Sequence, residues 1–313
     1  MRRFAFLLLF ASAAFSQDLR FASLGDFKLD SGEVIRDCRI GYRTYGKADA
    51  KTIVVTTWFG GTTASLASSI GPGKLFDSSK YYVIAIDALG DGVSSSPSNS
   101  TAQPNEQFPR FTISDMVRSQ HDLLTHELHV DHVYAVSGLS MGGMQAFQWI
   151  ASYPDFMDNA IPIAGTPKQT SYDLLLWKTE LNVLESGAQD VMKIIADMNS
   201  MHLNTPPYIV SHTDAAAIDA WMTSREASVE KLNRFDYEAQ LRAMIALDIG
   251  MTPRVPRMLV IVSEHDQMVN PTPARTFART HHAKLVTLTG DCGHLATACE
   301  ADKVRRAVWR FLD

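Results

Sequence analysis

The feature that most constrains the fold is the alternation of short, continuous apolar runs with longer segments of helical periodicity. The runs expected to form buried strands span residues 52–57, 81–88, 132–137, 160–164, 258–263 and 284–288. Segments with apolar residues at helical spacing span 113–128, 141–153, 273–281 and 302–311. Strands that are apolar throughout and alternate with helices predict a mostly parallel sheet covered by helices on both faces.

Two further stretches depart from this alternation. Residues 21–45 contain two runs of alternating polarity separated by Ser31-Gly32, which predicts an opening antiparallel pair. Between about residues 166 and 251 the pattern is helical and rich in Trp and Met, directly after the strand at 160–164. We interpret that stretch as a helical lid inserted into one large domain, residues 17–313. The 46% hydrophobic content supplies enough apolar material for a single core.

The N-terminal residues resemble a targeting segment. Arg2 and Arg3 precede an apolar run over residues 4–15, and Ala14-Phe15-Ser16 offers small residues for cleavage. Residues 1–16 are therefore predicted to be a signal peptide, with the mature chain beginning near Gln17 and located in the periplasm or secreted. The apolar run is too short for a stable membrane anchor.

Charge and histidine spacing exclude several kinds of partner. The net charge is −5 and no Lys/Arg-rich run is present, so no nucleic-acid partner is expected. His126 and His129 stand one residue too close for an H-E-x-x-H zinc motif, and they are interpreted as surface histidines. No glycine-rich phosphate loop occurs. We expect no metal and no cofactor.

The sharpest local motif is Gly138-Leu139-Ser140-Met141-Gly142. It follows the predicted strand 132–137 and opens the predicted helix 141–153, which is the setting of a nucleophile elbow. Small residues on both sides permit the strained turn that exposes a serine hydroxyl above the sheet. Ser140 is therefore the candidate nucleophile.

A serine nucleophile needs a base and an acid that orients the base. In the α/β-hydrolase fold the chain order is serine, acid, histidine. Asp266 follows the predicted strand 258–263, and His294 follows the predicted strand 284–288. Both lie where the carboxyl ends of the strands meet. Glu264 and Asp291 remain alternative acids.

The oxyanion hole is expected to use two backbone N–H groups, one from Met141 and one from the loop after the strand 52–57. That loop reads Trp58-Phe59-Gly60-Gly61-Thr62, and Phe59 is our choice for the second donor. Trp58 and Gly60 remain alternatives.

The three cysteines allow one short-range pairing. In an oxidising compartment Cys292 and Cys299 could form a disulfide, which would leave Cys38 free. The sequence leaves this pairing open, because it does not give the separation of the two Cα atoms.

A series of short motifs covers most of the mature chain. They are 29–33 (LDSGE), 42–46 (YRTYG), 71–77 (GPGKLFD), 108–117 (FPRFTISDMV) with Gln120, 140–146 (SMGGMQA), 153–155 (YPD), 234–236 (RFD) and 293–294 (GH). With these motifs the chain resembles the homoserine O-acetyltransferase-like branch of the α/β hydrolases. This resemblance implies an acyl-enzyme at Ser140 and a small-molecule acyl substrate. It does not decide whether the chain forms a homodimer.

One departure from the family pattern bears on the reaction. Acetyltransferases of the family carry an acidic residue directly after the catalytic histidine, where it holds the substrate amine, and here that position is Leu295. Ester hydrolysis by an exported enzyme is therefore the leading hypothesis. The alternatives are an O-acyltransferase of the homoserine O-acetyltransferase type that uses acyl-CoA, and a non-catalytic ligand-binding protein that keeps the fold.

Overall fold

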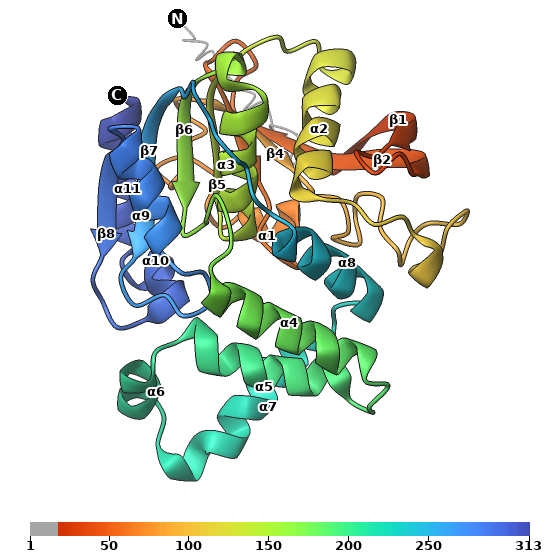
Figure 1. The fold of residues 1–313 in the computed structure, drawn as a ribbon. Coiled ribbons are helices and arrows are strands. Elements are labelled where there is room, and N and C mark those ends of the chain that lie inside the picture. Colours follow the sequence, from red (N-terminus) through yellow and green to blue (C-terminus); the bar gives the residue numbers. More distant parts are fainter. Residues whose placement is uncertain (1–17) are drawn as a thin grey trace, which may run out of the picture.

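The computed structural model describes residues 18–313, in which eight strands form one sheet in the order β1-β2-β4-β3-β5-β6-β7-β8 (Figure 1). The strands are β1 (Arg20–Lys28), β2 (Val34–Tyr45), β3 (Thr52–Thr56), β4 (Tyr82–Ile86), β5 (Val133–Leu139), β6 (Met157–Ile163), β7 (Arg257–Ser263) and β8 (Lys284–Leu288). Neighbours from β4 to β8 are parallel, whereas β2 runs antiparallel to both β1 and β4. The predicted α/β fold with an antiparallel opening pair is confirmed.

The central strands are apolar on both faces because helices cover both. Side chains of α2 (Ile113–Asp122), α3 (Met141–Ser152) and α9 (Thr272–Thr280) belong to one buried cluster, and those of α1 (Thr63–Leu66) and α11 (Ala301–Leu312) to the other. Burial from both sides explains why these strands appear as continuous apolar runs in the sequence.

One predicted helix differs in its C-terminal part. The segment expected to be helical over 113–128 is α-helical only to Asp122, and Leu123–Glu127 forms a π-helical turn. The Leu128 N–H donates to the Leu123 carbonyl at 3.0 Å, the wider spacing that defines such a turn. Leu123 and Leu124 are both fully buried. The wider turn accommodates two successive core residues.

Five helices lie between β6 and β7, within the stretch predicted to be an inserted lid. They are α4 (Ser171–Glu185), α5 (Val191–Leu203), α6 (Pro206–His212), α7 (Ile218–Val229) and α8 (Arg234–Ile245). Figure 1 shows α4 to α7 beyond the end of the sheet at which the parallel strands terminate. We refer to residues 166–251 as the helical insertion. The predicted signal peptide, residues 1–16, lies outside the described residues.

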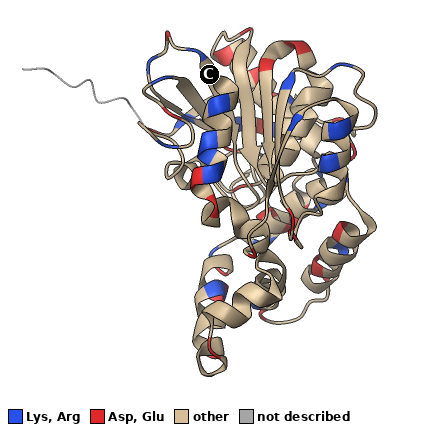
Figure 2. Cartoon of the chain, turned by 90° about the vertical axis from the view of Figure 1, so that its left-hand side faces the viewer, with Lys and Arg blue, Asp and Glu red and all other residues tan. Residues whose placement is uncertain are grey.

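The surface carries charges of both signs. Figure 2 shows the side of the molecule that lies on the left in Figure 1, where Lys and Arg are interspersed with Asp and Glu along the helices. Within residues 18–313, no helix combines the length and the hydropathy needed to cross a bilayer.

Candidate active site

Ser140 occupies a sharp turn between β5 and α3. Its backbone has φ 58° and ψ −120°, a combination that non-glycine residues rarely adopt. The Ser140 N–H donates to the carbonyl of Ile163 at the end of β6, at 2.9 Å. The turn is therefore held by the neighbouring strand, which compensates for its backbone strain.

The glycines around Ser140 are needed because other backbone segments approach closely. A Cβ added at Gly142 would lie 2.6 Å from the Thr56 carbonyl oxygen, and one at Gly143 would lie 2.7 Å from the Ile163 oxygen. An added Cβ at Gly138 would collide with the Thr56 side chain in the same way. These contacts explain the small residues of the motif, since only glycine lets β3, β5 and α3 pack this tightly.

Three predicted site residues meet in one hydrogen-bonded chain. His294 Nε2 lies 2.9 Å from Ser140 Oγ, and His294 Nδ1 lies 2.7 Å from Asp266 Oδ2. The other carboxylate oxygen of Asp266 accepts the N–H groups of Met268 and Val269 at 2.9 and 2.8 Å. His294 and Asp266 are each 7% exposed. This geometry matches a nucleophile, a base and an acid that orients the base.

The two alternative acids lie elsewhere. Glu264 and Asp291 are both exposed, and neither forms a hydrogen bond or ion pair with His294 among residues 18–313. The Asp291 carbonyl instead accepts the hydroxyl of Thr205 from the helical insertion. Asp266 is the only one of the three candidates that contacts the histidine.

The predicted donors of the oxyanion hole differ in whether another group already accepts their N–H. Met141 is the first residue of α3, so its N–H has no partner within the helix. The Gly60 N–H, one of the alternatives, donates to Gln240 Oε1 at 2.9 Å and is already occupied. Neither the Phe59 N–H nor the Trp58 N–H has a hydrogen-bond acceptor among the described residues. Met141 and Phe59 therefore remain the candidates for the oxyanion hole, with Trp58 as the alternative second donor.

A buried polar network fixes the start of the loop that carries Phe59. Gln145 Nε2 on α3 donates to the Thr57 carbonyl at 2.9 Å, and Gln145 Oε1 accepts from Gln120. Gln120 Oε1 in turn accepts the indole N–H of Trp149 at 2.9 Å. In the sequence, both glutamines stand out only as positions that match the family. Their role as supports emerges from tertiary contacts.

The loop that carries His294 is held on three sides. Ser263 Oγ at the end of β7 donates to the Gly293 carbonyl at 2.7 Å. From the helical insertion, Asn204 Nδ2 donates to the Cys292 carbonyl at 3.1 Å. Cys292 and Cys299 form a disulfide across the loop, and Cys38 is free and buried. The cysteine pairing that the sequence left open is thus formed.

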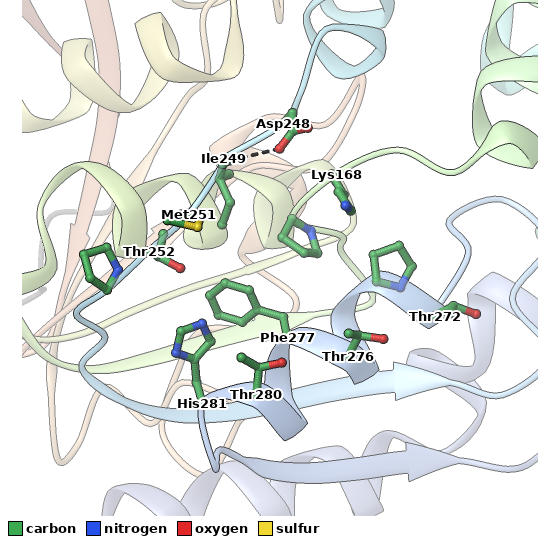
Figure 3. Close-up of a pocket in the computed structure, with 14 residues that line it drawn as sticks. Lys168, Asp248, Ile249, Met251, Thr252, Thr272, Thr276, Phe277, Thr280 and His281 are labelled. Atoms are coloured by element: carbon green, nitrogen blue, oxygen red, sulfur yellow. Dashed lines mark hydrogen bonds between the residues drawn. The ribbon is translucent and has the colours of Figure 1, made fainter.

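A cavity of about 690 Å³ lies apart from these residues, between helix α9 and the two segments that join the helical insertion to the sheet (Figure 3). Its walls consist mainly of Ile249, Met251, Phe277, three prolines and several threonines, and Ser140, Asp266 and His294 are not among them. Within residues 18–313, no group of three or more His, Cys, Asp or Glu side chains is placed to hold a metal ion.

A serine after β5, an aspartate after β7 and a histidine after β8 of a mostly parallel sheet define an α/β hydrolase. The model of the alpha/beta hydrolase fold family matches residues 58–298, and the chain belongs to that family. Within it, the relatives fit the branch that resembles homoserine O-acetyltransferases.

The sequence relatives include hydrolases and acyltransferases. A probable esterase of Corynebacterium glutamicum is 37% identical over 172 residues, covering 53% of this chain and 49% of that protein. An ethyl acetate hydrolase of Pseudomonas veronii is 36% identical over 160 residues, covering 49% of this chain and 45% of that protein. A homoserine O-acetyltransferase of Methanohalophilus mahii is 37% identical over 171 residues, covering 47% and 35%. The aligned part thus spans half or less of each relative.

Solved structures of both kinds share the whole fold. The acetyl esterase MekB superposes with a TM-score of 0.86 at 21% identity, covering 94% of this chain and 96% of that one. Homoserine O-acetyltransferase from Bacillus anthracis superposes with a TM-score of 0.82 at 19% identity, covering 95% and 97%. At this level of identity, the structural similarity establishes the fold but not the reaction. The reaction has to be inferred from the residues of the active site.

Proposed function

We propose that this protein is an exported serine esterase in which Ser140 is the nucleophile, His294 the general base and Asp266 the acid that orients it. The observation that carries this proposal is the continuous hydrogen-bonded chain from Asp266 through His294 to Ser140 Oγ, with Ser140 in a strained turn. The names of the esterase relatives are consistent with it.

In the first half of the reaction, Ser140 Oγ attacks the ester carbonyl while His294 Nε2 takes the hydroxyl proton. Negative charge then develops on the carbonyl oxygen, and the N–H groups of Met141 and Phe59 stabilise it. His294 returns the proton to the departing alcohol as the C–O bond breaks. An acyl-enzyme on Ser140 remains.

In the second half of the reaction, water replaces Ser140 as the nucleophile. His294 Nε2 takes a proton from the water as its oxygen attacks the acyl carbonyl, and the same N–H groups stabilise the second oxyanion. The proton then passes to Ser140 Oγ as the acid product leaves. Asp266 keeps the Nδ1 proton of His294 directed toward itself throughout, so that Nε2 faces the serine.

Hydrolysis is favoured over transfer by the residue after the base. Leu295 cannot form the ion pair with a substrate amine that an acidic side chain would form at that position. An exported enzyme would also meet water far more often than acyl-CoA or homoserine. The substrate proposed is accordingly a small ester without a cationic group beside the reacting carbonyl.

Export rests on the sequence of residues 1–16 and is supported by the disulfide between Cys292 and Cys299. Disulfides persist in oxidising compartments and are rare in the cytosol of most organisms. The proposed location is the periplasm or the extracellular medium.

Two assays on the purified mature protein test the proposal. One follows hydrolysis of p-nitrophenyl acetate, and the other follows CoA release from acetyl-CoA with and without homoserine. Ester hydrolysis without homoserine-dependent CoA release is the expected result.

Other outcomes would assign a different function. Homoserine-dependent CoA release would establish an acyltransferase, which the homoserine O-acetyltransferase relatives make the second candidate. Absence of both activities, with no covalent labelling of Ser140, would indicate a non-catalytic binding protein.

A further inference from the structure

Gln240 links the helical insertion to the loop that carries Phe59. It lies on α8 and is 1% exposed. Its Oε1 accepts the Gly60 N–H at 2.9 Å, and its Nε2 donates to the Leu89 carbonyl at 3.1 Å. One side-chain amide thus joins α8 to the loops after β3 and β4.

The contact falls on the Phe59–Gly60 peptide, directly after the Trp58–Phe59 peptide that carries the Phe59 N–H. Gly60 has φ +66°, and the Gly61 N–H donates to the Trp58 carbonyl at 2.9 Å, so Trp58–Gly61 is a tight turn with a left-handed third residue. Among residues 18–313, the Gly60 N–H is the one amide of this turn that donates to a distant part of the chain.

A second contact from the same helix supports the turn. The ring of Tyr237, three residues before Gln240 on α8, meets the Phe59 ring edge-on with centroids 4.4 Å apart. Residues three apart on a helix share a face. The face of α8 that carries Tyr237 and Gln240 therefore packs directly on the Phe59 turn.

We propose that Gln240 is a positioning residue, which holds the Phe59 N–H in the orientation that the oxyanion requires and so makes the helical insertion part of the catalytic geometry. This inference rests on the proposed function. Loss of the Gln240 amide leaves the Gly60 N–H without a partner and frees the turn to rotate. Because an oxyanion contact forms only in the transition state, the expected defect is in kcat rather than KM.

The first test compares two glutamines that hold the same helix. Gln240→Met keeps the length of the side chain and removes both hydrogen bonds. Gln169→Met is the matched control, because Gln169 Nε2 donates to the Met244 carbonyl near the end of α8 at 2.6 Å and does not contact the Phe59 turn. Gln240→Met is expected to lower kcat for p-nitrophenyl acetate about 30-fold, with KM changed less than about twofold. This loss is smaller than the roughly 10²- to 10³-fold loss caused by removing an oxyanion donor, because the Phe59 N–H is misplaced and not removed. The Gln169→Met variant is expected to keep kcat within about twofold.

A second variant keeps the inference testable if Gln240→Met does not fold. In Gln240→Glu, a protonated carboxyl accepts the Gly60 N–H and donates to the Leu89 carbonyl as the amide does, whereas an ionised one lacks the donor. Asp91, Asp236, Lys231 and Tyr237 line the same crevice as Gln240. Because Gln240 is 1% exposed, burial favours the protonated form of a carboxyl at this position, whereas the positive charge of Lys231 opposes it. The activity of Gln240→Glu, relative to wild type at each pH, is expected to rise as the pH is lowered.

Three results would overturn the inference: wild-type kcat in Gln240→Met, an equal loss of kcat in Gln169→Met, or a rise in KM alone. Ser140→Ala separates these from failure of the proposed function. If Ser140→Ala abolishes hydrolysis while Gln240→Met retains it, only the role of Gln240 is wrong. If Ser140→Ala retains hydrolysis, the proposed esterase mechanism is wrong as well.

Discussion

The sheet and the helical insertion contribute different things to the site. The sheet supplies the groups proposed to react, since Ser140, Asp266 and His294 each follow the carboxyl end of a parallel strand. The insertion supplies supports for two loops, through Gln240 to the Phe59 turn and through Asn204 to the loop of His294. Helices above such a sheet can therefore hold the active-site loops in place, besides covering the site.

The interiors of the two regions also differ. The sheet core around β3 to β7 is almost entirely apolar, with residues such as Val54, Ile84 and Ile261 fully buried. The insertion instead buries Glu180, whose Oε2 accepts the Tyr237 hydroxyl at 2.8 Å while its Oε1 has no partner among residues 18–313. Through this carboxyl, the insertion should contribute to the pH dependence of stability.

The largest effect is expected at the base supplied by the sheet. His294→Ala is expected to lower kcat for ester hydrolysis by about 10⁶, because Ser140 then has no proton acceptor. The exposed His265 serves as a control, and His265→Ala should stay within about twofold of wild type. Comparable losses in the two variants would show that the rate depends on the fold of this region rather than on the base.

The next effect concerns the acid. Asp266→Asn is expected to lower kcat by about 10⁴, since the amide favours the wrong tautomer of His294. Glu264→Gln and Asp291→Asn should keep kcat within a few-fold, because both side chains are exposed and away from the histidine. A large loss at either control position, with Asp266→Asn active, would reassign the acid.

A smaller effect should distinguish the insertion from the sheet. Burial raises the pKa of Glu180 from its ordinary 4.5 to about 7, although the hydrogen bond from Tyr237 opposes that shift. Between these two pKa values the folded state holds a proton that the unfolded state has released, so the free energy of unfolding decreases as pH rises through that window. The decrease attributable to Glu180 is about 3 kcal/mol.

Urea denaturation at pH 5 and pH 8 measures this decrease. Glu180→Gln should remove it, whereas Glu230→Gln, at an exposed position of the same insertion, should retain the wild-type difference between the two pH values. An unchanged pH dependence in Glu180→Gln would contradict a raised pKa of Glu180 in the folded protein.

The smallest effect is expected at the disulfide. Cys299→Ser opens a link between residues seven apart in the sequence, which should lower the free energy of unfolding by about 2 kcal/mol. The loss of kcat should be less than about tenfold, because Ser263 and Asn204 still hold the loop of His294. Adding a thiol reductant should destabilise wild type and leave Cys299→Ser unchanged; equal sensitivity of both would argue against the disulfide.

The sequence predicts the sheet more completely than it predicts the contacts of the helical insertion. Every strand of the parallel sheet was located within a few residues, because most of these strands are buried on both faces and so form continuous apolar runs. Ser140 stood out because its small neighbours, the preceding strand and the following helix are all local features. The helical segment predicted over 113–128 extends to Glu127, but its last turn is π-helical, which the spacing of apolar residues did not predict.

The supports from the insertion could not be predicted in this way. Gly60 and Gln240 are 180 residues apart, and neither stands in a motif that specifies the other. Asn204 and Cys292 are likewise 88 residues apart. Such contacts depend on how α5 and α8 are placed against the loops at the end of the sheet. The periodicity of the sequence does not specify that placement.

Fluorophosphonate labelling tests the central claim, that Ser140 is the nucleophile, most directly. Wild-type protein and Ser140→Ala would be treated with the probe beside a control serine hydrolase, and adducts located by peptide mass spectrometry. One adduct, on Ser140, is expected in wild type, and none in a folded Ser140→Ala variant. An unlabelled wild type, or an adduct that persists in Ser140→Ala under conditions that label the control, would contradict it.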